Sequence, residues 1–214
     1  MTVNLISYTQ SASGLSLTEQ VSYVARVSNP ANQNNMDTSD RLIRYLIKNQ
    51  HWSPFEMVSV CLDIQTTRDI ARQILRHRSF SFQEFSQRYA KVAEPMVFRD
   101  ARLQDNKNRQ NSVVTDDKEL MREWRNVQDS VQNATQWAYE WALENGIAKE
   151  QARVVLPEGM TPSRIYMNGT LRSWIHYIQL RSANGTQQEH REIAIHCANA
   201  IEPIFPMIKE FISE

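Results

Sequence analysis

The stretch that decides how this chain is interpreted is Arg76–Tyr89, which reads RHRSFSFQEFSQRY. It combines three arginines, a histidine and four hydroxyl side chains with three phenylalanines. Its apolar residues keep neither the 3.6-residue period of a surface helix nor, over the whole stretch, the two-residue period of a strand. We therefore predict a dense set of hydrogen-bond donors held against aromatic anchors. Such a set is typical of a site for a phosphorylated, planar ligand.

Arginine accounts for most of this prediction. A guanidinium offers a planar fork of donors that matches a phosphate or carboxylate, and it also stacks on flat rings. Arg76 and Arg78 flank His77, so their side chains diverge, and Ser86 and Arg88 follow after a bend. Arg-His-Arg alone also fits a solvated helix end, because cations are favoured in the last turn of a helix. The full spacing of Arg-His-Arg, seven residues and serine is much more specific.

The composition is that of an ordinary globular protein, with 214 residues, 41% hydrophobic and 22% charged. The 24 basic and 24 acidic residues cancel, so no global field favours a nucleic acid or an anionic membrane as partner. The two cysteines, Cys61 and Cys197, lie far apart, which favours a reducing compartment over a disulfide framework. No leader pattern or membrane-length apolar segment is recognised, and a cytoplasmic protein is expected.

Hydrophobic periodicity predicts a mixed α/β fold of the α+β type, a single domain in which helices surround a modest central sheet. Strands are expected at 3–9 and 55–64, where β-branched and apolar residues recur or alternate. Exposed loops are expected at 100–112 and 157–162. Helices are expected at 18–28, 37–47, 66–77, 117–145, 148–156, 171–183 and 187–200, with a short final helix from Glu202.

The long helix at 117–145 has an apolar row of its own. This row, which we call the α-seam, recurs at alternating spacings of four and three, as in a coiled coil. Its tryptophans would also suit a ring-binding platform, but the spacing favours packing in the core or between subunits. The α-seam consists of Leu120, Trp124, Val127, Val131, Ala134, Ala138 and Trp141.

The signature Arg-His-Arg-x7-Ser is similar to that of the flavin-dependent thymidylate synthases, which are unrelated to the thymidylate synthases that use a cysteine nucleophile. Other segments resemble landmarks of this family and follow the family's order. They are Ala25–Ser28 (ARVS), Ser53–Glu56 (SPFE), Ala152–Pro157 (ARVVLP), and the run from Leu171 through Arg181 to Glu189. The resemblance covers nearly the whole chain, so residues 1–214 are expected to form one domain of this family.

The resemblance implies reductive methylation of dUMP to dTMP. FAD would be the cofactor, with NADPH and 5,10-methylenetetrahydrofolate as co-substrates, and a homotetramer would share its active sites between subunits. Neither cysteine lies in an arginine-rich niche that would favour a thiolate, and this absence also favours a hydride supplied by a flavin. The chain has no glycine-rich dinucleotide motif, so the FAD expectation depends on the resemblance.

The resemblance also implies roles for individual residues. Around dUMP it places Gln73, Arg76, Glu84, Ser86, Gln87, Arg88, Arg153 and Arg181. Around FAD it places Ser28, Arg76, His77, Arg78, Ser79, Gln83, Glu84, Thr170, Arg172 and His176. Arg181 is expected to activate the uracil by stabilising the negative charge that develops on the ring. A helix-terminal arginine that offsets the dipole is its alternative, as a helix-end hydroxyl is for Ser28.

The chain departs from the family pattern at three positions. Gln83 stands where asparagine is usual, and Met57 and Gly185 replace frequent histidines, whose roles therefore do not carry over. Ser86 has no local histidine and aspartate to activate it, so a phosphate or backbone contact is expected instead of a nucleophile. No metal site is predicted.

Two functions remain open at this point. One is the enzyme; the other is a nucleotide- or RNA-binding module in which arginines bind phosphates and phenylalanines stack on bases. The balanced charge and the lack of an extended basic stripe argue against the module.

Overall fold

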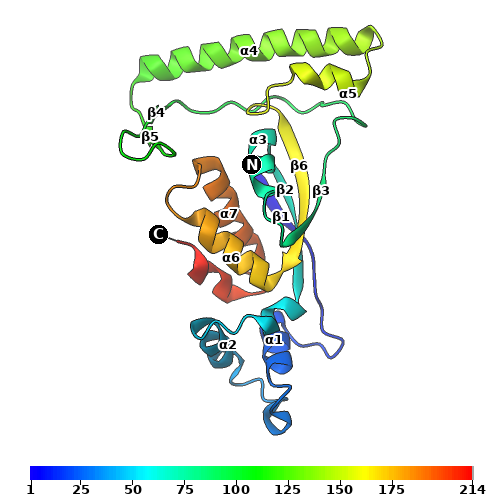
Figure 1. The fold of residues 1–214 in the computed structure, drawn as a ribbon, viewed down its shortest axis with the longest axis vertical. Coiled ribbons are helices and arrows are strands. Elements are labelled where there is room, and N and C mark those ends of the chain that lie inside the picture. The colour runs from blue at the N-terminus through cyan, green and yellow to red at the C-terminus, as the bar shows by residue number, and fades with distance from the viewer. Residues whose placement is uncertain (214) are drawn as a thin grey trace.

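The fold is described from a computed structural model, which covers residues 1–213. Its centre is a four-stranded antiparallel sheet in the order β1-β2-β6-β3, and a separate two-stranded sheet pairs β4 with β5 (Figure 1). The strands are β1 Thr2–Tyr8, β2 Ser59–Thr67, β3 Phe80–Glu84, β4 Arg102–Gln104, β5 Ser112–Val114 and β6 Pro162–Thr170. The predicted mixed α/β fold is confirmed.

The helices follow the predicted periodicity closely. The α-helices are α1 Leu17–Ala25, α2 Ser39–Lys48, α3 Arg68–Ile74, α4 Lys118–Glu144, α5 Lys149–Ala152, α6 Leu171–Ser182 and α7 Gln188–Ile201. Short 3₁₀ helices occur at η1 Pro30–Asn32, η2 Ser53–Met57, η3 Arg153–Val155 and η4 Pro206–Phe211. Helix α1 is capped by Ser16, because Ser16 and Glu19 form a reciprocal capping box.

The core lies between one face of the main sheet and helices α6 and α7 (Figure 1). Strand β6 alternates strictly, with Ile165 and Met167 buried and Arg164 and Tyr166 exposed. Trp174 of α6 is fully buried, and its indole N–H donates to the Val60 carbonyl at 2.9 Å. Burial of this ring therefore leaves no unpaired donor at its nitrogen.

The prediction that 76–89 contains no regular strand is wrong for its middle part. Phe80–Glu84 pairs with β6 in register, with Phe80 opposite Gly169. A Cβ atom on Gly169 would lie 2.3 Å from the Phe80 ring, so the ring occupies space that only glycine leaves free. The strand ends at Glu84, which is why Phe85 falls out of step.

Strand β6 itself was overlooked in the sequence, and three other expectations need correction. Helix α3 ends at Ile74, so Arg76 and His77 follow the helix and do not lie on it. The segment 100–112 contains β4 and begins β5, because the two strands pair with each other. The last helix is a 3₁₀ helix that begins at Pro206, because Pro206 lacks the N–H that would bond to the Glu202 carbonyl in an α-helix from Glu202.

Helix α4 lies across one end of the molecule, away from the main sheet (Figure 1). Gln128 ties it to the preceding segment by exchanging two 2.9 Å hydrogen bonds with the Arg99 backbone. The α-seam, however, remains exposed: Trp124 is 41%, Val127 52% and Trp141 51% accessible. The expectation that the α-seam packs in the core of this chain is therefore wrong. The alternative, that it packs between subunits, stays a prediction.

Candidate active site

Arg181 and His77, far apart in the sequence, meet where α6 ends and the chain leaves α3. The Nε–H of Arg181 donates to His77 Nε2 at 2.9 Å. The two terminal nitrogens of Arg181 have no hydrogen-bond or ion-pair partner among residues 1–213. The guanidinium is therefore fixed at one end and has free donors at the other.

His77 is neutral in this arrangement. Burial, together with the positive charges of Arg181 and Arg76, lowers the pKa of His77 from 6.5 to about 4. A neutral imidazole has one unprotonated nitrogen, and here that nitrogen accepts the hydrogen bond from the Arg181 Nε–H. The His77 ring also packs edge-on against Tyr177, with ring centroids 4.9 Å apart.

Gln73 joins α3 to the start of α7. Its Nε2 donates to Gln187 Oε1 at 2.7 Å, and its Oε1 lies 3.2 Å from His190 Nδ1. Gln187 in turn donates from Nε2 to Glu189 Oε2 at 3.0 Å. None of the residue roles inferred from the sequence included His190 or Gln187. The run of five consecutive polar residues, Gln187–Arg191, at the start of α7 is the signal that could have found them.

Glu189 is the charged residue at the end of the hydrogen bonds that run from Gln73 through Gln187. It forms an ion pair with Arg99 at 3.2 Å and another with Arg102. Burial acts to raise the pKa of Glu189, but a backbone hydrogen bond and the two arginines outweigh it, so the pKa lies below its ordinary value. The carboxylate is therefore ionised at neutral pH.

A second group of predicted residues surrounds the first turn of α6. Thr170 caps the helix by accepting from the Ser173 backbone N–H at 3.3 Å, and the Ser173 hydroxyl donates to the Ser79 carbonyl at 3.3 Å. Arg172 forms an ion pair with Glu56. His176, one turn further along, packs edge-on against Trp52, with centroids 4.6 Å apart. Burial and the charge of Arg172 lower the pKa of His176.

The third group follows β3. Glu84 accepts from the Ser163 hydroxyl at 2.9 Å and pairs with Arg68 at 3.5 Å. Gln87 is buried, and its Nε2 has no hydrogen-bond partner within the described residues. A buried amide without a partner carries a desolvation cost that a bound acceptor would relieve. Gln83 and Ser86 are exposed.

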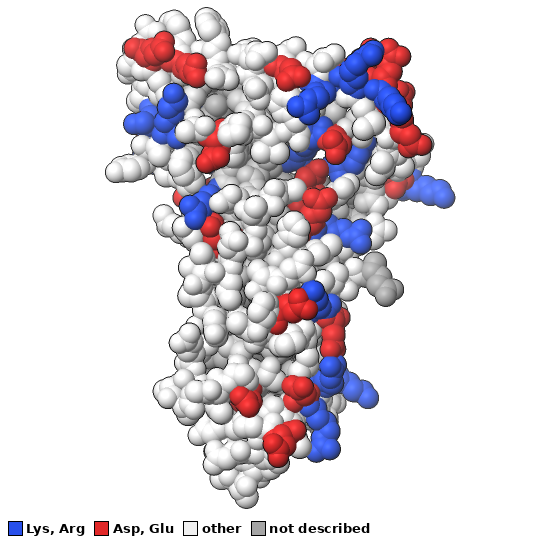
Figure 2. Space-filling model, turned by 180° about the vertical axis from the view of Figure 1, so that it is seen from behind, with Lys and Arg blue, Asp and Glu red and all other residues white. Residues whose placement is uncertain are grey.

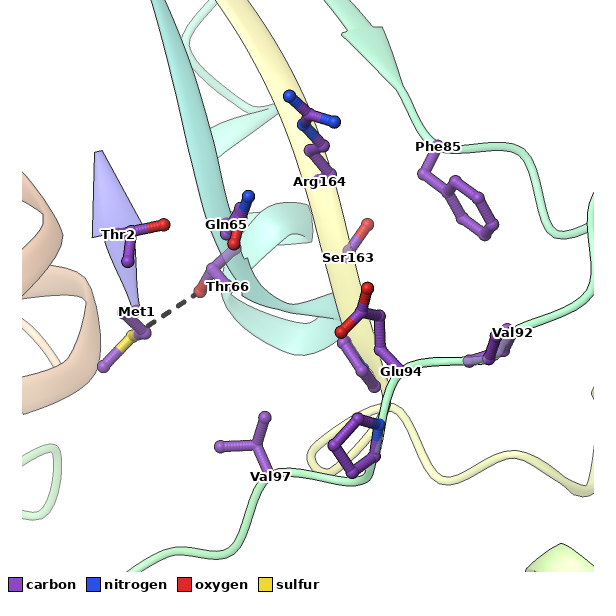
Figure 3. Close-up of a pocket in the computed structure, with 13 residues that line it drawn as sticks. Met1, Thr2, Gln65, Thr66, Phe85, Val92, Glu94, Val97, Ser163 and Arg164 are labelled. Carbon is purple, nitrogen blue, oxygen red and sulfur yellow. Dashed lines mark hydrogen bonds between the residues drawn. The ribbon is translucent and has the colours of Figure 1, made fainter. Parts of the chain in front are cut away.

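Beside this group lies a pocket of about 400 Å³. Figure 3 shows it between the N-terminal residues Met1 and Thr2, the segment from Phe85 to Val97, and Ser163 of β6. Gln65 and Arg164 lie at its side, on neighbouring strands (Figure 3). The pocket combines apolar walls with a few polar groups, as small-molecule sites do.

The remaining predicted residues lie elsewhere. Arg88 pairs with Glu150 at 3.3 Å near α5, and Arg153 donates to the Glu150 carbonyl at 3.3 Å. Ser28 is exposed and follows the end of α1, and helix α1 lies toward the opposite end of the molecule from α4 (Figure 1). Among residues 1–213, neither Ser28 nor the Arg88–Arg153 group forms a hydrogen bond or ion pair with Arg181. Helices α5 and α1 lie toward opposite ends of the molecule (Figure 1), so one chain does not gather all the predicted residues into one place.

The cysteines and the surface charge fit the chemistry expected from the sequence. Burial raises the pKa of both the Cys61 and the Cys197 thiols, so neither is a thiolate at neutral pH. Figure 2 shows basic and acidic side chains interspersed over one face of the molecule, with no continuous basic stripe on that face. Within residues 1–213, no helix has both the length and the apolar character needed to cross a bilayer.

Known proteins match this chain over nearly its whole length. The family described as "Thymidylate synthase complementing protein" matches residues 4–207. A probable flavin-dependent thymidylate synthase of Paramecium bursaria Chlorella virus 1 is 50% identical, with 100% of this chain and 96% of the relative covered. The flavin-dependent thymidylate synthase of Synechocystis sp. is 46% identical, covering 88% of this chain and 86% of the relative.

A solved structure agrees with these matches. The UMP/dUMP methylase PolB from Streptomyces cacaoi, bound with 5-Br dUMP, superposes with a TM-score of 0.83 at 28% identity, covering 98% of this chain and 93% of its own. None of these relatives is described as a nucleic-acid-binding module, the alternative left open by the sequence. This chain belongs to the family of flavin-dependent thymidylate synthases.

Proposed function

We propose that this chain converts dUMP to dTMP by reductive methylation, with 5,10-methylenetetrahydrofolate as the carbon donor and NADPH as the source of reducing equivalents. The observation that supports this most is the state of Arg181. Its Nε is held by a neutral His77 while its terminal nitrogens are uncommitted. A cation fixed in this way stabilises negative charge on a uracil ring without reorganising during the reaction.

The donor set suits FAD. Arg76 and Arg78 are exposed and make no side-chain hydrogen bond or ion pair among residues 1–213, and Thr170 caps the N-terminus of the twelve-residue helix α6, where the helix dipole favours an anion. These groups match a diphosphate. Bound flavin would supply the hydride. The residues proposed to hold it are Ser28, Arg76, His77, Arg78, Ser79, Gln83, Glu84, Thr170, Arg172 and His176.

The nucleotide would use the remaining arginines and amides. Arg88 and Arg153 are proposed to bind the phosphate, with Ser86 as a further donor, because a guanidinium fork matches phosphate oxygens. The unpaired Nε2 of Gln87 is available to an acceptor on the ligand. The full proposed set is Gln73, Arg76, Glu84, Ser86, Gln87, Arg88, Arg153 and Arg181.

The site is proposed to be completed in a homotetramer. This follows from the separation of Arg88 and Arg153 from the Arg181 group within one chain, and from the exposed α-seam, which offers an apolar surface for association. The proposal treats residues 1–214 as one domain and places the enzyme in the cytoplasm.

The visible spectrum of the purified protein tests the function. A flavin band should be bleached by NADPH and restored by dUMP together with methylenetetrahydrofolate, but by neither alone. UMP in place of dUMP measures specificity for the deoxyribose. A colourless protein that also fails to bind added FAD would end the enzyme proposal.

The role of Arg181 is tested by substitution. Arg181→Ala should reduce dUMP-dependent flavin oxidation by about 10²–10³-fold, the usual cost of losing a charge-stabilising donor. Arg181→Lys keeps the charge but loses the fork and should recover only part of the rate. Normal turnover by a folded Arg181→Ala variant would exclude the role.

A further inference from the structure

His190 is a fully buried side chain that the proposed function does not use. It lies in the first turn of α7 with 0% of its surface exposed. Its Nε2 is 3.1 Å from the Tyr177 hydroxyl, and its Nδ1 is 3.2 Å from Gln73 Oε1. Both ring nitrogens are therefore engaged, and which of them donates depends on the neighbouring groups.

The carboxylate of Glu189 sets the direction of these bonds. An ionised carboxylate only accepts hydrogen bonds, so Gln187 must turn its NH₂ group toward Glu189. The Gln187 oxygen then faces Gln73, which must donate from its own NH₂ group at 2.7 Å. This leaves the Gln73 oxygen for His190, and His190 must donate from Nδ1.

The other nitrogen of His190 is consequently an acceptor. Burial is the main cause that lowers the pKa of His190 to about 3, so the ring is neutral and its Nε2 is bare. Burial also raises the pKa of Tyr177, which keeps its proton and donates it to Nε2. All four hydrogen bonds thus point the same way, from Tyr177 through His190, Gln73 and Gln187 to Glu189.

We propose that His190 is a positioning residue for the nucleotide site, which it serves by fixing the amide of Gln73. The inference rests on the proposed function, because Gln73 is one of the residues assigned to dUMP. With its oxygen bonded to His190 and one N–H bonded to Gln187, Gln73 presents its second N–H in a defined direction. Without His190, the amide is tethered by one bond and can rotate away.

The direction of the bonds is tested without substrate or flavin. In protein labelled with ¹⁵N-histidine, His190 should show a protonated Nδ1 and a bare Nε2. The chain has five histidines, so the signal is assigned by its loss in a His190→Asn variant. A protonated Nε2, or a charged ring at neutral pH, would overturn the inference whether or not the protein is an enzyme.

Two amide substitutions of His190, to asparagine and to glutamine, test whether His190 affects the binding of dUMP through Gln73. The shorter amide introduced by His190→Asn can replace the Nδ1–H that bonds Gln73, whereas the longer side chain in His190→Gln reaches the Nε2 position and keeps only the Tyr177 bond. His190→Gln should raise the KM and the calorimetric Kd for dUMP about tenfold, consistent with the loss of one buried hydrogen bond, and should change kcat much less. His190→Asn should stay near the wild-type values.

Cys197→Ala is the stability control, because Cys197 is buried on the same face of α7, two turns further along, and forms none of the four hydrogen bonds. It should lower Tm without changing the KM for dUMP. A His190→Gln variant with wild-type KM and Kd, or one matched by His190→Asn, would overturn the positioning role. A wild-type protein that never turns over dUMP would overturn the proposed function instead.

Discussion

The region around α6 and α7 and the helix α4 differ in how far their side chains find partners within the chain. Beside α6 and α7, the half-buried Gln73 and the fully buried His190 both find hydrogen-bond partners within the chain. Along α4, Trp124 and Trp141 are left about half exposed in a regular row. We infer from this difference that one chain arranges the groups around Arg181 alone, and we propose that a second copy covers the apolar row of α4.

The largest expected effect comes from placing charges on the α-seam. Val127→Glu combined with Val131→Glu should dissociate the oligomer, because association would bury two unpaired carboxylates. The chain should stay folded, since both side chains are exposed, 52% and 40%. Light scattering after gel filtration reports the mass. Asn133→Glu, exposed on the same helix but outside the α-seam, is the control, and an unchanged mass in the double variant would contradict the proposed surface.

Gly169→Ala should damage the region around α6 and α7 without touching α4. The added Cβ would lie 2.3 Å from the Phe80 ring, which must move out of its buried position. Overpacking of this kind costs about 1–3 kcal/mol of unfolding free energy, measurable by urea denaturation. Gly159→Ala meets nothing within 4 Å and serves as the control. Equal stability of the two variants would contradict the close packing of β3 on β6.

The smallest expected effect concerns pH. The pKa of His77 falls from 6.5 to about 4 on folding, so the folded state favours the neutral ring. Its contribution to stability is complete above pH 6.5 and is lost as the pH falls through 4, because the unfolded chain takes up the proton first. His77→Gln, which does not titrate, should show a shallower loss of stability across this window. Parallel curves for the two proteins would contradict the assignment.

Much of the fold follows from local patterns. The alternation of Val58, Val60, Leu62 and Ile64 predicted β2, and all four side chains are fully buried. Strand β6 was not predicted because it starts at a proline and contains Asn168 and Gly169 near its end, and these are poor strand formers. Strand β3 was also not predicted. Its extended conformation comes from pairing with β6, and local periodicity does not reveal such pairing.

The sequence predicts which residue types make up the candidate site, but it does not predict which of their side chains meet. The arginines of the signature stand out in the sequence, yet the bond between His77 and Arg181 joins residues 104 positions apart. The role of His190 depends on four further residues, which come together only when α3 and α6 pack beside α7. Long-range packing therefore decides which polar side chains meet, and no spacing in the sequence encodes it.

Mixing two inactive variants tests most directly whether one site draws its arginines from different copies. Arg153→Ala and Arg181→Ala should each be inactive alone. When mixed by joint refolding, they should recover about a quarter of the wild-type activity, because a random oligomer gives about one site in four both intact arginines. Activity no greater than that of the separate variants, in a mixture shown to form mixed oligomers, would contradict the account and place both arginines in the same chain's site.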